Sequence, residues 1–264
     1  MLTAGQIAHF ETFGFLVLRQ LFSQDEISIM KRESVEIFDE ERGGTPYTGG
    51  EPEVIQPFME RRPFLSKLVD DDRIYNIGVD LCGPDFVLAH NGGALHVGDT
   101  SWHRDASLET PIKDAQINFY TQPLTRDTGC LRVIPGSHHL ASPDPFALLD
   151  DYIMDRSEDP DFMPFGVRPS EIPGYAVESQ PGDVVVFTES LAHASFGGEA
   201  GRHHYGMNFI ANPKTDEQTA YIKSLYKSWK YGLRPAESYV NSDRPRIRRM
   251  VSRLVELGFE TSKV

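Results

Sequence analysis

Hydrophobic residues change their spacing twice along the chain, and the two changes divide it into three parts. Residues 1–82 carry apolar positions at the three- and four-residue intervals of amphipathic helices. Residues 83–212 instead hold short runs rich in β-branched and aromatic residues, separated by clusters of Gly, Pro and Asp that are typical of turns. Helical spacing returns in residues 213–264. The pattern predicts one domain with a helical N-terminal support, a mainly β core and a helical tail.

Both helices at the start of the chain begin with the same four-residue motif. Thr3 and Gln6 are spaced as a capping box, in which the first side chain accepts a backbone N–H three positions on and the second reaches back. Ser23 and Glu26 repeat the motif before a helix that we expect to end near residue 39. Neither helix carries a catalytic pattern, so we interpret both as support for the core.

The central part contains six segments with the composition of strands. They are residues 86–89, 115–120, 130–134, 175–178, 183–187 and 204–210. Many short strands between helical flanks favour a β-sandwich or barrel. Two stretches rich in Pro and Gly, residues 42–57 and the insertion 138–174, are predicted to be loops, and loops this long often serve as lids over a site.

Two helices are predicted in the tail, one over residues 215–229 and one that Ser242 and Asp243 cap. The second helix has an apolar face at helical spacing. Its remaining positions are rich in arginine, and we interpret these arginines as the solvated face of an amphipathic helix rather than as a basic binding patch.

Composition narrows the classes of partner. The formal net charge of the 264-residue chain is -13, which argues against nucleic acid or an anionic membrane surface. The two cysteines, Cys82 and Cys130, are too few for a disulfide framework or a structural zinc site. No apolar run is long enough to span a membrane, and no secretory signal is visible. We expect a soluble cytoplasmic protein, and the sequence does not indicate an oligomeric state.

The candidate chemistry begins at residues 101–105. In an extended strand His103 and Asp105 point to the same side, because side chains alternate faces. An imidazole and a carboxylate presented together are two thirds of the 2-His-1-carboxylate group that binds non-haem Fe(II). His193 follows the apolar strand 183–187 in a short connection and is placed to be the third ligand. Arg202 lies in the next strand, where a buried guanidinium requires an anion.

The order of these residues resembles the phytanoyl-CoA dioxygenase family of Fe(II)- and 2-oxoglutarate-dependent oxygenases. The motifs that carry the resemblance are His103-x-Asp105, the stretch Thr128-Gly-Cys-Leu-Arg-Val-Ile-Pro-Gly-Ser-His138, Pro181-Gly-Asp183, His193-x-Ser195 and Arg202. The likeness covers most of residues 3–212, including the opening helices, and leaves residues 140–174 and the tail unmatched. It implies a double-stranded β-helix, a cupin-like jelly roll of eight core strands with a metal at its open end.

The resemblance also implies roles for single residues. His103, Asp105 and His193 would bind Fe(II). Arg202 would form a bidentate pair with the distal carboxylate of 2-oxoglutarate, the cosubstrate, and Ser195 would hydrogen-bond the same group. On the strand after the first motif, Gln116 and Asn118 are further candidates for holding the cosubstrate.

The implied reaction consumes O2 and 2-oxoglutarate and releases succinate and CO2 while a second substrate is oxidised. Ascorbate is expected to support the activity in vitro. Related halogenases replace the carboxylate ligand by a small residue, and here Asp105 is present. Hydroxylation, or another oxidation such as desaturation or ring closure, is therefore expected.

The substrate is the least determined part of the prediction. The chain has no extended Lys/Arg patch for the phosphates of coenzyme A, which favours a small molecule. The family often has Gln between the first His and Asp, whereas this chain has Arg104. We hypothesise that Arg104 or His96 meets an anionic or polar group of the substrate.

Two other classes of function fit part of the pattern. The first is a non-catalytic, cupin-like binding module in which His103 and Asp105 form a structural pair. The second is a divalent-metal enzyme that is not an oxygenase, such as an isomerase or hydrolase, because two His and an Asp also suit other metals. The binding module is disfavoured because the three ligand positions and Arg202 are all filled. Arg202 and Ser195 discriminate an oxygenase from the second class, since a hydrolase has no need of a carboxylate clamp.

Overall fold

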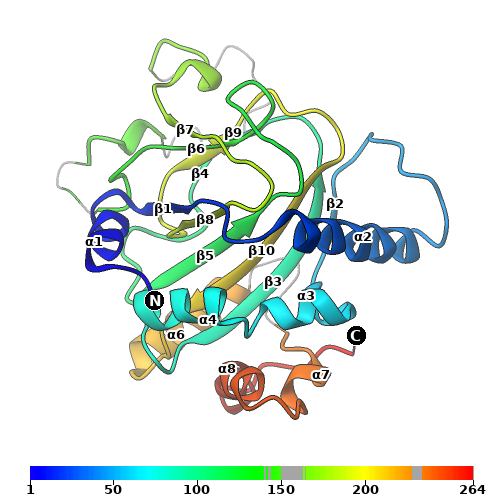
Figure 1. Ribbon diagram of the computed structural model, residues 1–264. Coiled ribbons are helices and arrows are strands. Elements are labelled where there is room, and N and C mark those ends of the chain that lie inside the picture. Colours follow the sequence, from blue (N-terminus) through cyan, green and yellow to red (C-terminus); the bar gives the residue numbers. More distant parts are fainter. Residues whose placement is uncertain (140, 142–143, 150–162, 164, 228–233, 264) are drawn as a thin grey trace.

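Two antiparallel sheets face each other in the computed structural model, and helices cover the outer side of the larger one (Figure 1). The structure describes residues 1–264 except 140, 142–143, 150–162, 164, 228–233 and 264. The larger sheet has the strand order β1-β8-β5-β10-β3-β2 and the smaller one β4-β9-β6-β7. This arrangement confirms the mainly β jelly-roll class with flanking helices, although the sheets are not closed into a barrel.

The strands are β1 Phe15–Leu18, β2 Glu53–Ile55, β3 Val87–His96, β4 Thr100–His103, β5 Asp114–Phe119, β6 Leu131–Val133, β7 Tyr175–Val177, β8 Val184–Phe187, β9 His193–Ser195 and β10 Arg202–Ile210. The α-helices are α1 Ala4–Phe13, α2 Gln24–Glu41, α3 Pro63–Leu68, α4 Asp72–Cys82, α6 Asp216–Lys227, α7 Glu237–Val240 and α8 Pro245–Glu256. Two short 3-10 turns are η1 Met59–Arg61 and η2 Pro169–Glu171. All six predicted strand segments are therefore strands, and β2 lies inside the stretch 42–57 that was predicted to be loop.

Both predicted capping boxes are present. The Thr3 hydroxyl accepts the N–H of Gln6 at 3.2 Å, and the Gln6 side chain accepts the N–H of Thr3 at 2.8 Å. Ser23 and Glu26 form the same reciprocal pair at the start of α2. Helix α1 ends at Gly14, whose φ of 80° is the left-handed conformation that glycine adopts without strain.

Helices and sheet meet in the main hydrophobic core. Helix α4 packs on β5 and β10, and α8 packs on β3, so the outer face of the larger sheet is covered (Figure 1). Fully buried aromatic residues fill the space, among them Phe86 and Phe209, whose ring centroids are 4.6 Å apart. The inner face of the same sheet is left to line a cavity.

The last helix differs from its prediction in two ways. Its N-cap is Arg244, without a side-chain hydrogen bond, and Pro245 occupies its first turn, so Ser242 and Asp243 lie before the helix. Proline suits this position because its missing N–H has no partner there in any case. The arginines are also not simply solvated: Arg244 pairs with Asp70 at 2.8 Å and donates to the Ser66 carbonyl at 3.1 Å. These contacts fasten the start of α8 to the segment around α3.

The C-terminal end of the insertion 138–174 is fastened to the smaller sheet. The Trp102 indole N–H donates to the carbonyl of Pro169 at 2.8 Å, and Arg132 donates to the carbonyl of Ser170 at 2.8 Å. Much of the rest of the insertion, and Trp229 of the predicted tail helix, lie outside the described residues. Among the described residues no helix has the length and apolar character needed to cross a bilayer.

Candidate metal and cosubstrate site

A cavity of about 500 Å³ lies between the two sheets. Its floor is the inner face of the larger sheet, where alternate residues of β3, β5 and β10 point inward. The register aligns them in rows across the sheet: Arg202 opposes His96, and Asn208 opposes both His90 and Gln116. The facing wall comes from β4 and β9 of the smaller sheet.

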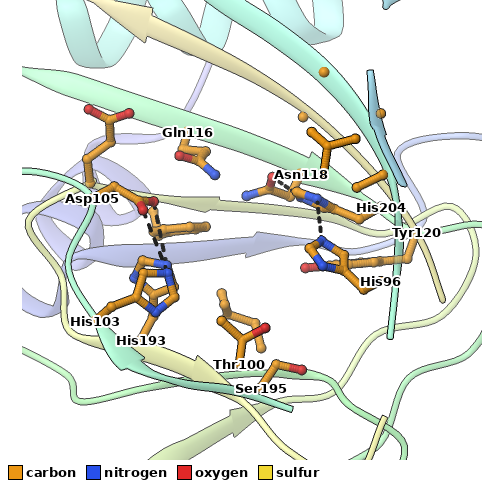
Figure 2. A pocket seen from close by; sticks show the side chains of 18 of the residues that line it. His96, Thr100, His103, Asp105, Gln116, Asn118, Tyr120, His193, Ser195 and His204 are labelled. Carbon is orange, nitrogen blue, oxygen red and sulfur yellow. Dashed lines mark hydrogen bonds and ion pairs between the residues drawn. The ribbon is translucent and has the colours of Figure 1, made fainter. Parts of the chain in front are cut away.

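The three predicted metal ligands, His103, Asp105 and His193, converge at the wall that β4 and β9 form (Figure 2). His103 at the end of β4 is the register partner of His193 at the start of β9, and their ring centroids are 4.0 Å apart. Asp105 places one carboxylate oxygen 3.6 Å from Nε2 of His103 and the other 3.5 Å from Nε2 of His193. One ligand atom from each of the three residues lies within 4.8 Å of the others.

The local structure of two ligands differs from the sequence prediction. His193 belongs to strand β9 and not to a connection. Strand β4 ends at His103, so Asp105 is not placed by strand alternation. Asp105 instead lies in the following bend, where its N–H donates to the carbonyl of Glu189 at 2.8 Å. That hydrogen bond ties the second ligand to the loop that leads into β9.

Backbone carbonyls orient both imidazoles. Nδ1 of His103 lies 2.8 Å from the carbonyl of Ser101, and Nδ1 of His193 lies 2.9 Å from the carbonyl of Leu191. Each Nδ1 therefore donates to its carbonyl, and in the neutral form of such a ring the lone pair is on Nε2. Burial, together with the nearby His103, lowers the pKa of His193 to about 4, so this ring is neutral at neutral pH.

The donor set fits a divalent cation. The two Nε2 atoms face the oxygens of Asp105 at 3.5 and 3.6 Å, distances too long for good hydrogen bonds, so the three side chains converge without bonding to one another. A divalent cation bound there would be held by His103, Asp105 and His193, which offer two imidazole nitrogens and a carboxylate oxygen.

Arg202 lies at the other end of the floor, at the start of β10, and is 4% exposed. Gly129 and Gly198 leave room for its guanidinium, because a Cβ at either position would overlap Nη1. Among the described residues Arg202 forms no salt bridge, and its Nη1 has the Gly98 carbonyl at 3.4 Å. Burial lowers the pKa of this guanidinium, which is the cost of placing a cation there without a partner.

The other predicted cosubstrate residues also line the cavity. The Ser195 hydroxyl donates to the Gly129 carbonyl at 2.9 Å, so it must rotate before it can donate to a ligand. Gln116 and Asn118 project inward from β5 (Figure 2). Asn118 is engaged already, since its Oδ1 accepts from Nε2 of His204 at 2.5 Å.

The two candidate substrate residues are placed differently. His96 lines the cavity, and its Nε2 lies 3.3 Å from Nδ1 of His204, which extends the chain of polar contacts from Asn118 (Figure 2). Burial lowers the pKa of His96 to about 4. Arg104 is not part of the cavity wall, and its guanidinium donates to the Ser137 carbonyl at 3.4 Å.

Sequence reasoning missed several residues of the wall. His204 follows Arg202 by two residues on β10, and Tyr120 follows Asn118 by two residues just past the end of β5, so two-residue alternation was a signal that could have found them. His90 and Glu189 carried no such signal. Burial raises the pKa of the Glu189 carboxyl to about 8, and the charge of Asp105 adds to the shift.

The geometry agrees with what comparison with known proteins shows. The family model described as phytanoyl-CoA dioxygenase matches residues 10–203, which is most of the chain. The chain belongs to the phytanoyl-CoA dioxygenase family. The match includes both histidines and the aspartate of the converging group, together with Arg202. No curated protein sequence matches the chain significantly.

Solved structures share the fold of this phytanoyl-CoA dioxygenase family member. HygX from Streptomyces hygroscopicus, with nickel and 2-oxoglutarate bound, superimposes with a TM-score of 0.58 at 21% identity over 79% of this chain and 86% of that one. EctD from S. alaskensis, with 2-oxoglutarate and 5-hydroxyectoine, gives 0.58 at 19% identity over 80% and 77%. The non-heme alpha ketoglutarate dependent carbocyclase SnoK from nogalamycin biosynthesis gives 0.59 at 17% identity over 80% and 85%.

Proposed function

We propose that the protein is a non-haem Fe(II)- and 2-oxoglutarate-dependent dioxygenase, built as one catalytic domain over residues 1–264, that hydroxylates or otherwise oxidises a small molecule. The observation that carries the proposal is the convergence of the Nε2 atoms of His103 and His193 on the two oxygens of Asp105, with both Nδ1 atoms turned to backbone carbonyls. Family membership and the cosubstrate in the HygX and EctD structures support it. The net charge of -13 favours a small-molecule partner over nucleic acid. We also propose that the protein is cytoplasmic.

In this proposal His103, Asp105 and His193 hold Fe(II), which supplies the chemistry that activates O2 and splits 2-oxoglutarate into succinate and CO2. The buried Arg202 receives the distal carboxylate, which neutralises a cation that has no salt-bridge partner in the described chain. Ser195 adds a hydrogen bond after its hydroxyl turns from Gly129. The apolar side chains of Phe187 and Leu225 line the cavity and would keep water from the reacting carbon.

Turnover of the cosubstrate tests the proposal directly. Purified protein with Fe(II), ascorbate and a screen of metabolites is expected to convert 2-oxoglutarate into succinate, and His103→Ala and Asp105→Ala are expected to abolish this conversion. The proposal fails if the wild type binds neither Fe(II) nor 2-oxoglutarate in anaerobic spectroscopy. A protein that binds both but never releases succinate would favour the non-catalytic binding module.

The cavity separates the two substrate hypotheses. His96 lines it and Arg104 does not, so with a substrate from the screen we expect weaker substrate binding in His96→Ala and little change in Arg104→Ala. Binding titrations of the Fe(II)- and 2-oxoglutarate-loaded protein measure both. Equal affinities in wild type and His96→Ala would remove His96 from the substrate site.

A further inference from the structure

The floor of the cavity has two polar ends of different charge. Arg202 begins strand β10, and Asn208 lies six residues further along it, about 20 Å away at about 3.3 Å per residue. In the two rows between them Gly206 opposes Gly92 and His204 opposes Ala94, so three of the four residues are small. The Arg202 end offers a cation, which the proposed function assigns to 2-oxoglutarate.

The opposite end offers a carboxyl group. Glu189 lines the cavity and is 5% exposed. One of its carboxyl oxygens accepts from the side-chain amide of Asn208 at 2.8 Å and lies 3.7 Å from Nε2 of His90. The proposed binding of Fe(II) and of 2-oxoglutarate uses none of the side chains of Glu189, Asn208 and His90.

The backbone holds Glu189 rigidly beside the proposed metal site. Its N–H donates to the Asp114 carboxylate at 2.6 Å. Its carbonyl accepts the N–H groups of Asp105 at 2.8 Å and Ala106 at 3.1 Å. The carboxyl group of Glu189 is therefore fixed next to the loop of a proposed metal ligand, where a molecule to be oxidised must come close.

A second acceptor lines the same cavity. The Oε1 of Gln56 is buried and has no hydrogen-bond partner among the described residues. The Gln56 side chain lies over Gly92, in the middle of the floor. A buried carbonyl oxygen without a partner costs free energy, which a ligand that brings an N–H or O–H would recover.

We propose that Glu189 is a specificity-determining residue that binds a basic nitrogen of the substrate, an amine or ammonium N–H group, with Gln56 as a second acceptor. This inference rests on the proposed function and names the substrate class of that site. An ammonium ion beside Glu189 favours the ionised form of this buried carboxyl. Because the charges of Asp105 and of 2-oxoglutarate balance those of Fe(II) and Arg202, the pair leaves the filled cavity neutral.

Three matched probes test the assignment: cyclohexylmethylamine, cyclohexylmethanol and cyclohexanecarboxylate. They have nearly the same apolar body and differ in their polar group. Anaerobic titration calorimetry on protein loaded with Fe(II) and 2-oxoglutarate gives each dissociation constant. We expect the amine to bind at least about tenfold more tightly than the alcohol, and the acid most weakly, because a buried charge pair contributes more than a neutral contact.

Glu189→Gln removes the charge and keeps the shape and an oxygen for Asn208, so it is expected to abolish the preference for the amine. The exposed Glu217→Gln on α6 is the matched control and is expected to keep it. Unchanged Fe(II) binding shows that each variant is folded. The assignment is overturned if the wild type shows no preference for the amine, or if Glu189→Gln retains it.

The outcomes separate this inference from the proposed function, because binding of the probes does not require turnover. A protein that releases succinate without preferring the amine would contradict only the role proposed for Glu189. The opposite outcome is a protein that prefers the amine only when Glu189 is present and never converts 2-oxoglutarate. That result would contradict only the proposed oxygenase reaction.

Discussion

Single residues decide how the proposed metal and cosubstrate are held. Carbonyls of Ser101 and Leu191 fix the tautomers of the two imidazoles and direct their lone pairs at Asp105. These orientations come from neighbours two residues away, so they are part of the local strand geometry. The environment of Arg202 is different, since glycines distant in sequence create it.

The space around Arg202 leads to a prediction. In Gly198→Ala the new Cβ would overlap Nη1 of Arg202, and no positive φ complicates the change. We expect the guanidinium to move and the requirement for 2-oxoglutarate to rise at least about tenfold, with Fe(II) binding retained. Succinate release against 2-oxoglutarate concentration measures it. Gly50→Ala, where the nearest atom is 3.7 Å away, should behave as wild type.

Arg202→Ala tests the role of the cation itself. Loss of the bidentate partner is expected to raise the 2-oxoglutarate requirement by about a hundredfold or more, while Fe(II) affinity stays near that of the wild type. Kinetics and anaerobic metal titration measure the two effects separately. Equal loss of metal and cosubstrate binding would contradict the assigned role and point to collapse of the cavity.

At the scale of elements, strand pairing assembles the site. Register between β4 and β9 sets His103 opposite His193, and register between β10 and β3 sets Arg202 opposite His96. Helices α4 and α8 cover the outer face of the larger sheet (Figure 1), and α6 adds Leu225 to the cavity wall, but the proposed metal and cosubstrate residues lie on strands and on the bend at Asp105. Helix stability and site chemistry should therefore be separable.

The capping box of α2 tests that separation. Ser23→Ala removes the acceptor for the N–H of Glu26 and is expected to lower the free energy of unfolding by about 1 kcal/mol. Urea denaturation measures the change. Ser28→Ala, within the same helix, removes only a hydroxyl that bonds to the Gln24 carbonyl, and we expect almost no effect. A loss of succinate release in Ser23→Ala at low temperature would link the helix to the site.

For the whole molecule, burial of acidic groups makes stability depend on pH. Desolvation raises the pKa of Glu60 from 4.5 to about 7, and its Oε1 accepts from the Asn91 side chain at 2.8 Å. Because the folded state holds the proton more tightly, this contribution to stability is complete below pH 4.5 and is lost as pH rises towards 7.

Glu60→Gln tests this dependence. The amide cannot ionise and still offers an oxygen to Asn91, so the fall in unfolding free energy between pH 4.5 and 7 is expected to shrink by up to roughly 3 kcal/mol. Denaturation curves at several pH values measure it. The exposed Glu51→Gln serves as the control. If the unfolding free energies of wild type and Glu60→Gln changed in parallel with pH, the pKa of Glu60 would not be raised in the folded state.

Local patterns in the sequence were sufficient for much of the architecture. Capping boxes at Thr3 and Ser23, the six strand segments and the mainly β class follow from interactions within a few residues, and the structure confirms them. The order of the motifs along the sequence predicted that His103, Asp105 and His193 form one set of metal ligands. In the structure the three side chains converge.

The contacts between distant segments were decided only by the tertiary structure. Asp105 reaches its place through the carbonyl of Glu189, and not through strand alternation, and the space for Arg202 depends on Gly129 and Gly198. The carboxyl of Glu189 lines the cavity because β8, β9 and β10 bring it to Asn208. Propensity and alternation act along the chain, whereas register, burial and cavity shape come from long-range packing that a single sequence does not encode locally.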